Sequence, residues 1–369
     1  MKIAPFKLEQ YFSEYEFIAP YLLSSSDCEP LTLAELLAMA NEELLRLWQT
    51  LSLGYTETQG HPLLREEIAR FHTHVVPDDV LLLAPEEGIF VAMNVLLGGG
   101  DHVIVTFPGY QSLYELAQAI GCTVSRWVPR KQNTWVFDVN ELRAAIRHNT
   151  KLIVINFPHN PTGAMLSLQD FEAVLAIARE RGIFVFSDEM YRFLEPVAGH
   201  RLPAASDLYD DAVSLFGVSK SFSLPGLRIG WLTTRNRDLL RQCLEFKTYT
   251  TICNNAPGEI LALIALRARD RILQRNLAII RDNLDELDAF FARHADRFEW
   301  IPPRAGPIAF PALRHGPGIE TFCRELVKRK GVMLLPGTVY DYPGNHFRIS
   351  ACRLNMPVAL ARLEQYLAC

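Results

Sequence analysis

Residues 150–191 read TKLIVINFPHNPTGAMLSLQDFEAVLAIARERGIFVFSDEMY, and this stretch decides the fold. Its two short apolar runs, Leu152–Asn156 and Ile183–Phe186, are typical of buried strands. Between them, Leu168–Arg181 has the apolar spacing of a helix. Strand and helix alternate here within one short stretch, and such alternation builds a mostly parallel sheet.

The same alternation extends outward in both directions, from about residue 80 to residue 234. It predicts an α/β fold whose mostly parallel sheet is covered by helices on both faces. The remaining expected strands are Val80–Leu83, Val103–Thr106, Ala212–Phe216 and Arg228–Leu232, and the remaining expected helices are Glu87–Leu97, Ser112–Ile120 and Asn140–His148.

The segments that flank this alternation have a different character. Residues 1–50 mix short polar stretches with one amphipathic helix, Leu33–Trp48, and the pattern from Asn255 to His294 is helical and long. Residues 296–369 alternate short strands with helices and predict a smaller α+β domain. We therefore expect an N-terminal segment at 1–45 that packs with the small domain, a large domain at 46–265 and a small C-terminal domain at 266–369. Expected elements of the small domain are strands Ile308–Phe310, Val332–Leu335 and His346–Ser350, and helices Ile319–Lys330 and Pro357–Leu367.

Composition excludes several classes of function. A chain of 369 residues is long enough for two domains, and its net charge of −5 comes with no dense run of Lys or Arg. We therefore expect no nucleic-acid partner and no anionic membrane surface. There is no apolar run of about 18 residues, and charges interrupt the N-terminus where a signal peptide would be apolar. The seven Cys form no CxxC pair and no zinc spacing, which predicts reduced thiols, a cytoplasmic location and no metal.

Residues capable of chemistry follow the expected strands. In open α/β sheets, ligands bind at the carboxyl ends of the strands, so these residues are the candidates for a site. The triplet Gly98-Gly99-Gly100 follows a helix and does not form GxGxxG, which excludes a dinucleotide-binding Rossmann motif. The candidates are Phe107-Pro-Gly-Tyr110, Asn160-Pro-Thr-Gly163, Ser187-Asp-Glu-Met-Tyr191, Gly217-Val-Ser-Lys220 and Pro225-Gly-Leu-Arg228, with Pro85-Glu-Glu-Gly88 at the start of a helix.

The ordered set of these phrases resembles the fold-type I enzymes that use pyridoxal phosphate, specifically the class I and II aminotransferase family. The match extends from Tyr55-x-x-x-x-Gly60-x-x-x-Leu64-Arg65 to Phe347-Arg-Ile-Ser350, which is nearly the whole chain. The resemblance implies pyridoxal 5'-phosphate as the cofactor and Lys220 as its Schiff-base lysine. Taken alone, a Lys after a strand is usually a solvated surface residue.

The resemblance also implies a role for each neighbour of Lys220. Asp188 would pair with the ring nitrogen of the cofactor, although an Asp here could also be a helix N-cap. Asn160 and Tyr191 would bind the phenolate oxygen of the ring, Asn160 would also face the substrate, and Tyr110 would stack on the ring. The alternatives are an ordinary turn for Asn160 and a plain core aromatic for Tyr110.

At the phosphate end, the resemblance assigns Arg228 as a bidentate ligand, with Ser219 beside it. The helix that starts at Glu86, Glu87 and Gly88 would offer backbone N–H groups to the same phosphate. Tyr55 would reach the phosphate from the neighbouring subunit, which implies a homodimer with a shared active site. Arg348 would bind the α-carboxylate of the amino acid or 2-oxo acid substrate.

Two departures from the family pattern affect the phosphate site. Gly217 stands where the family often has a phosphate-binding Ser, and Pro85-Glu86 stands where it often has a small residue followed by Ser or Thr. Pro85 has no N–H to donate. We expect Glu86 to turn away and to contribute only its N–H, so that the phosphate depends more on Arg228, Ser219 and Tyr55.

The N-terminal stretch Ser24-Ser-Ser-Asp-Cys-Glu-Pro30 occupies the place of a strand that lines the substrate pocket in the family. Asp27, with Glu29, could meet a cationic side chain there, and an acidic surface turn is the alternative. The amino-acid sequence around Asp27 and Pro85 resembles that of capreomycidine synthase-like members of the family, which act on arginine-derived substrates.

Three functions are consistent with these residues. The leading one is an aminotransferase that moves an amino group between an amino acid and a 2-oxo acid. The second is an elimination or cyclisation of an arginine-derived amino acid, which needs the same Lys220 and Asp188. The third is a non-catalytic ligand-binding protein on the same scaffold, and only the altered phosphate site favours it.

Overall fold

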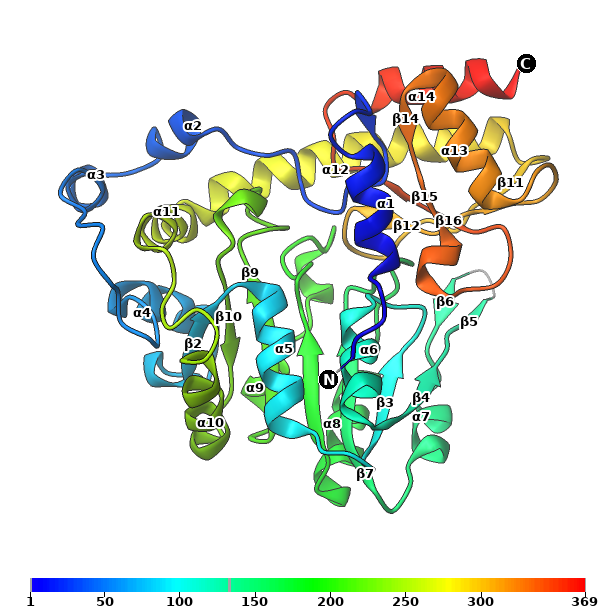
Figure 1. Cartoon of the computed structure of the whole chain (residues 1–369). Helices are drawn as coiled ribbons and strands as arrows, with labels where there is room; N and C mark the ends of the chain where they lie inside the picture. The colour runs from blue at the N-terminus through cyan, green and yellow to red at the C-terminus, as the bar shows by residue number, and fades with distance from the viewer. Residues whose placement is uncertain (1, 132–133, 369) are drawn as a thin grey trace.

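A seven-stranded sheet forms the centre of the large unit (Figure 1). The computed structural model describes residues 2–131 and 134–368. The strand order is β2-β10-β9-β8-β7-β3-β4, and only β10 runs antiparallel to its neighbours, which confirms the expected mostly parallel sheet. The strands are β2 (Val80–Leu83), β3 (His102–Thr106), β4 (Thr123–Trp127), β7 (Thr150–Asn156), β8 (Phe184–Asp188), β9 (Ala212–Gly217) and β10 (Gly230–Thr233).

Helices cover both faces of this sheet, as its mostly apolar and buried central strands require. Alternate residues point to opposite faces: Val103 and Val105 pack with α5, α6 and α10, whereas Ile104 belongs to the core on the other side. The helices of the large unit are α4 (Pro62–Ala69), α5 (Pro85–Leu96), α6 (Ser112–Ile120), α7 (Val139–Ala145), α8 (Leu168–Arg181), α9 (Ala205–Leu208), α10 (Arg237–Lys247) and α11 (Ala256–Arg267).

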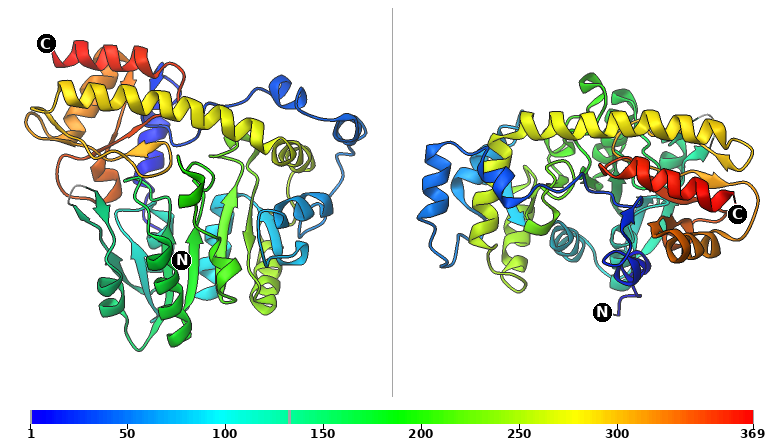
Figure 2. Two further views of the ribbon diagram at one scale, coloured as in Figure 1. Left: turned by 180° about the vertical axis from the view of Figure 1, so that it is seen from behind. Right: turned by 90° about the horizontal axis from the view of Figure 1, so that it is seen from above.

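The C-terminal residues form a smaller α+β unit above the carboxyl ends of the strands, and α12 runs along the whole molecule to join the two (Figures 1 and 2). Its three-stranded sheet has the order β12-β16-β15. Its elements are α12 (Arg269–Arg293), β11 (Phe298–Glu299), β12 (Ile308–Ala309), β13 (Ala312–Leu313), α13 (Ile319–Lys330), β14 (Val332–Met333), β15 (Leu335–Pro336), β16 (Phe347–Ser350) and α14 (Met356–Leu367).

The N-terminal segment reaches this smaller unit. Its strand β1 (Tyr21–Leu22) pairs in parallel with β14, and its helix α1 (Lys7–Tyr15) buries Leu8, Tyr11, Phe12 and Tyr15 between the two units. Helices α2 (Leu33–Leu37) and α3 (Glu42–Gln49) follow, and a hairpin of β5 (Arg130–Lys131) and β6 (Trp135–Val136) projects from the large unit.

Several sequence-based boundaries were wrong. The single helix expected over Leu33–Trp48 is two helices, because Asn41 caps the first turn of α3 by accepting from Leu44 N. The helical stretch after Asn255 is interrupted at Ala268. The strand expected over Arg228–Leu232 begins at Gly230, because Arg228 has a left-handed backbone with φ of 58°. Helix α1 and strand β4 were not anticipated.

In the described part of the chain, no helix combines the length and apolar character needed to cross a membrane. The six described cysteines are free thiols.

Candidate active site

A cavity of about 330 Å³ opens at the carboxyl ends of β7, β8 and β9, beneath the smaller unit and beside α1. Most of the residues singled out in the sequence line it. In-register pairing of Asn156 with Asp188 brings the ends of β7 and β8 side by side, so the two loops that follow open onto one place. The predicted site residues in its lining are Asp27, Glu86, Tyr110, Asn160, Asp188, Tyr191, Ser219, Lys220, Arg228 and Arg348.

Lys220 lies three residues beyond the end of β9, and its side chain extends into the cavity. Its Nζ donates a hydrogen bond to Ser26 Oγ at 3.0 Å. Burial lowers the pKa of this amine, and Asp27 partly opposes that effect. An amine whose charged form is destabilised in this way is available as a nucleophile and as a proton carrier.

Asp188 is the last residue of β8 and is almost fully buried. Burial raises the pKa of its carboxyl group to about 7, although a hydrogen bond from Met190 N to Oδ1 (3.1 Å) favours the charged form. A buried carboxylate is stabilised by a cationic or N–H partner, and the cavity leaves space for one beside Asp188.

Arg348, on β16, is only 2% exposed, yet its guanidinium forms no ion pair with any described acidic residue. It donates instead to neutral oxygens: Ser24 O through Nη2 (2.6 Å), Tyr340 Oη through Nη1 (2.7 Å) and Asn160 Oδ1 through Nη1 (3.3 Å). A buried cation without a counterion is costly. The cavity that it lines therefore suits a ligand carboxylate.

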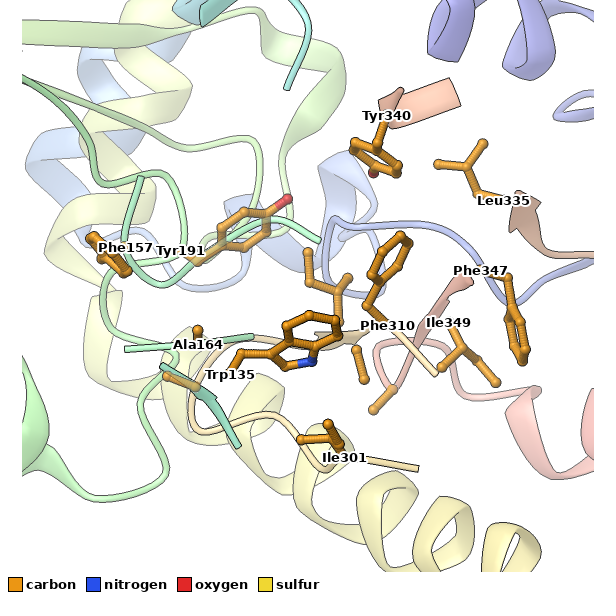
Figure 3. Packing of buried hydrophobic residues seen from close by; sticks show 14 of the residues in the cluster. Trp135, Phe157, Ala164, Tyr191, Ile301, Phe310, Leu335, Tyr340, Phe347 and Ile349 are labelled. Atoms are coloured by element: carbon orange, nitrogen blue, oxygen red, sulfur yellow. The ribbon is translucent and has the colours of Figure 1, made fainter. Parts of the chain in front are cut away.

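Asn160 and Tyr191 complete the wall beneath Arg348. Asn160 Oδ1 accepts from Tyr340 Oη (3.1 Å) as well as from Arg348, so the amide side chain is held in place from the smaller unit. Burial raises the pKa of the Tyr191 hydroxyl above its usual range. Figure 3 shows Tyr191 and Tyr340 among the aromatic and aliphatic side chains of one buried cluster.

Ser219 and Arg228 also line the cavity. Ser219 Oγ is buried and has no hydrogen-bond partner among the described residues. Within the described part of the chain, the Arg228 guanidinium forms no ion pair and donates only to Pro225 O at 3.0 Å. An unpartnered hydroxyl and an unneutralised guanidinium in one cavity are suitable ligands for a phosphate group.

Pro85 and Gly217, the two departures from the family pattern, form one packing unit. Gly217 pairs with Gly230 across β9 and β10, and the Pro85 ring lies over both. A Cβ added at Gly217 would lie 3.2 Å from Pro85 Cγ and 2.9 Å from Gly230 Cα. The proline therefore occupies the space that a side chain at position 217 would need.

Glu86 lines the cavity, and its carboxylate accepts a hydrogen bond from Ser112 Oγ, a residue outside the cavity lining; burial raises the pKa of this carboxylate. The expectation that Glu86 turns away from the phosphate and contributes only its N–H stays a prediction. Glu87 instead faces the loop after α10, where its Oε1 accepts from Thr251 Oγ1 at 2.8 Å. Gly88 does not line the cavity: its N–H donates to Ala84 O within the helix.

The mouth of the cavity is acidic. Glu9 and Glu16, from α1 and its C-terminal cap, line it together with Asp27. Asp27 forms an ion pair with Arg353 at 2.8 Å, and Glu29 accepts from Leu354 N instead of lining the cavity. The hydroxyl of Tyr110 donates to Glu9 Oε1 at 3.4 Å.

Tyr55 does not line the cavity of its own chain and is 90% exposed. The sequence also missed Glu9, Phe12, Glu16 and Tyr340, and it gave Ser26 no role of its own within the stretch Ser24–Pro30. The residues of α1 carry no motif that marks them, and Ser26 and Tyr340 come close to Lys220 and Asn160 only through the fold.

The unpartnered polar groups of the cavity match the polar groups of pyridoxal phosphate. The buried Ser219 hydroxyl and the free Arg228 guanidinium suit the phosphate, and Asp188 suits the ring nitrogen. Lys220 lines the same cavity, as the Schiff-base lysine of such an enzyme must. The residues present therefore fit the cofactor.

Comparisons with known proteins agree with this geometry. The family model for aminotransferase class I and II matches residues 21–361. Capreomycidine synthase of Streptomyces vinaceus is 30% identical over 90% of this chain and 86% of its own length. An aspartate aminotransferase of Thermococcus kodakarensis is 29% identical over 89% and 83%.

The solved structures that superpose on this chain are also pyridoxal phosphate-dependent enzymes. A pyridoxal phosphate-dependent aminotransferase from Streptococcus suis superposes with a TM-score of 0.93 at 30% identity, covering 100% of this chain and 98% of that one. The pyridoxal phosphate-dependent cyclase OrfR superposes with a TM-score of 0.91 at 27% identity and the same coverage. The chain belongs to the class I and II aminotransferase family, has its fold-type I architecture and uses pyridoxal phosphate as its cofactor.

Proposed function

We propose that the chain is an aminotransferase that moves an amino group between an amino acid and a 2-oxo acid, with Lys220 as its Schiff-base lysine. The observation that carries this proposal is Arg348, a buried cation without a described counterion in the same cavity as Lys220. Amino acids and 2-oxo acids share the α-carboxylate that such a cation binds. The presence of aspartate and diaminopimelate aminotransferases among the relatives also supports it.

Each residue of the cavity has a defined task in this proposal. Pyridoxal phosphate supplies the electron sink. Arg228 and Ser219 hold its phosphate, and the Asp188 carboxylate holds a proton on its ring nitrogen. Arg348 fixes the substrate carboxylate, which turns the Cα–H bond toward Lys220. The Lys220 amine then accepts the proton from Cα and delivers it, which is general acid–base catalysis.

The test is a pair of half-reactions on the loaded enzyme. An amino donor should convert the bound cofactor to its amine form, and a 2-oxo acid should convert it back; Lys220→Ala should do neither at a measurable rate. If neither conversion occurs with a broad panel of donors and acceptors, the proposal fails. A protein that stays colourless with pyridoxal phosphate and is not labelled at Lys220 by borohydride would instead be a non-catalytic binding protein.

A second candidate is an elimination or cyclisation of an arginine-derived amino acid. Two observations favour it: the similarity to capreomycidine synthase and to the cyclase OrfR, and the acidic mouth of the cavity. The same Lys220 would remove the Cα proton, and a β-leaving group would then depart. Product mass separates the candidates, because elimination consumes no 2-oxo acid and forms no amine form of the cofactor.

We also propose that the enzyme is a homodimer with a shared active site. Large apolar side chains are exposed on two segments, one around Tyr55 and one around Ile252. A hydrogen bond from Thr56 Oγ1 to Asn254 O joins these two segments. The second segment also contacts Glu87 at the start of α5, close to the proposed phosphate site. A second subunit on this patch would cover it and bring its own Tyr55 toward that site. The exposed residues are Leu53, Tyr55, Tyr249 and Ile252.

The expected cytoplasmic location remains part of the proposal. The free thiols of the six described cysteines are consistent with a reducing compartment.

A further inference from the structure

The cavity has more carboxylates than its cations can neutralise. Three cations face five acidic side chains, and the pyridoxal phosphate-dependent reaction assigns a partner to each cation. Lys220 binds the cofactor, Arg228 its phosphate and Arg348 the substrate carboxylate, so none of the three remains for an acidic residue. The acidic residues in the lining are Glu9, Glu16, Asp27, Glu86 and Asp188.

Three of these acids also have partners of their own. Asp27 is paired with Arg353 at 2.8 Å, and Asp188 is directed to the ring nitrogen of the cofactor. Glu86 accepts from Ser112 Oγ at the phosphate end of the cavity. Glu9 and Glu16 remain. Glu9 accepts only a long hydrogen bond from Tyr110 Oη (3.4 Å), and among the described residues the Glu16 carboxylate has no hydrogen bond or ion pair.

The geometry of α1 directs both carboxylates to the cavity that Arg348 lines. Positions 9, 12 and 16 lie on one face of a helix, because they follow its three-to-four-residue spacing. Phe12, between the two acids, covers Arg348, whose guanidinium carbon lies 5.7 Å from the ring centroid. Glu9 and Glu16 therefore line the same cavity as Arg348, on either side of the ring that covers its guanidinium.

The carboxylates near Glu16 produce a negative electrostatic potential, which favours a bound cation. Burial raises the pKa of Glu16, and the nearby Asp27 and Glu9 raise it further, whereas the smaller effects of Lys220 and Arg353 lower it. Mutual repulsion among these carboxylates is relieved when a positive charge is placed between them.

We propose that Glu9 and Glu16 form the subsite for a positively charged substrate side chain, an amine or a guanidinium. The proposal rests on the proposed function, because it takes Lys220 and Arg348 as the groups that hold the other end of the substrate. It assigns side-chain specificity to the N-terminal helix and not to Asp27, whose charge Arg353 neutralises.

The test uses two ligands that differ mainly in charge and cannot react, because both lack the α-amino group. These are δ-guanidinovalerate and δ-ureidovalerate, whose dissociation constants are measured by calorimetry on the enzyme loaded with pyridoxal phosphate. We expect the guanidino ligand to bind at least about tenfold more tightly, since charge-assisted hydrogen bonds are the stronger ones. Glu16→Gln and Glu9→Gln should each weaken the guanidino ligand by about five- to tenfold and leave the ureido ligand unchanged.

Glu14→Gln is the matched control. Glu14 belongs to the same helix but pairs with Arg324 outside the cavity, so this variant should bind both ligands as the native enzyme does. Equal affinity of the native enzyme for the two ligands, no binding of either, or an equal loss for both ligands in the Gln variants would overturn the subsite. Failure of the proposed function has a different signature: neither an amino donor nor a 2-oxo acid then converts the bound cofactor, whichever of the two ligands binds.

Discussion

Arg348 shows how one buried residue can carry a functional assignment. Four hydrogen bonds to neutral oxygens hold its guanidinium, and no described acid neutralises its charge. The sequence could identify this arginine because it stands in an apolar strand within a recognisable phrase, Phe347-Arg-Ile-Ser350. It could not show that Ser24, Asn160 and Tyr340 hold the side chain, because those contacts connect distant parts of the chain.

Replacing Arg348 with Met should weaken binding of amino acid substrates by about 10- to 100-fold, the loss expected for a hydrogen bond to a charged group. The dissociation constant of an amino acid, measured by the absorbance change of the loaded enzyme, checks this. The corresponding amine without a carboxylate is the control and should bind equally to both proteins. An equal loss for both ligands would show that Arg348 acts by supporting the fold.

Replacing Arg228 with Ala should raise the dissociation constant of pyridoxal phosphate by about tenfold or more, because the guanidinium is the only cation at the phosphate end of the described cavity. Titration of the apoenzyme with the cofactor measures this. Pyridoxal without the phosphate should bind equally to the native enzyme and to the variant. An unchanged dissociation constant for pyridoxal phosphate would count against the assignment.

At the scale of elements, Asp207 joins α9 to the loop after α4. Its Oδ1 accepts from Thr73 N (3.0 Å) and His74 N (2.8 Å), and its Oδ2 lies 3.1 Å from His72 Nδ1. Burial alone would raise the pKa of this carboxyl, but the hydrogen bonds from His72 and from the His74 and Thr73 backbone outweigh it and lower the pKa to about 2. The ionised form is therefore the one that stabilises this junction.

The consequence is a defined dependence of stability on pH. Because the pKa of Asp207 is lower in the folded chain than its unfolded value of about 4, its contribution is fully present above about pH 5 and declines as the pH falls toward 2. Asp207→Asn should reduce the free energy of unfolding by about 2 to 3 kcal/mol at pH 7, measured by urea denaturation. The difference from the native protein should shrink at pH 4, and a constant difference would contradict this account.

The sequence anticipated six of the seven strands of the large sheet and the helices between them, because each is a local pattern; β4, which is partly exposed, was missed. It missed α1, which is short and mostly polar, with Leu8 and Tyr11 buried only by packing between the two units. It also read residues 33–48 as one helix, since the apolar spacing continues through the break that the Asn41 cap introduces. The catalytic candidates followed strand ends and could be found, whereas the acids of α1 required the tertiary structure.

At the scale of the whole molecule, the proposed dimer predicts complementation between defective subunits. Mixed Lys220→Ala and Tyr55→Ala chains would form hybrids in which one site has an intact Lys220 and receives an intact Tyr55. After co-refolding, the mixture should contain sites with native affinity for pyridoxal phosphate, which neither variant has alone. Light scattering should show two chains per particle, and a monomer or an absence of high-affinity sites would contradict the shared site.

The Pro85 ring over Gly217 and Gly230 has a consequence for how this sequence can change. A serine at position 217 would meet the proline ring, and a side chain at position 230 would meet it more closely, at 2.8 Å from Pro85 Cγ. The three positions are therefore coupled, but the ring is not the nearest obstacle at position 217, where an added Cβ would lie 2.9 Å from Gly230 Cα and 3.0 Å from Ile229 O. Loss of the ring alone does not make room for a serine, because the backbone of β10 must also move away from β9. Related chains that keep this proline should also keep both glycines, and chains that have the serine should differ both at position 85 and in the spacing of these two strands.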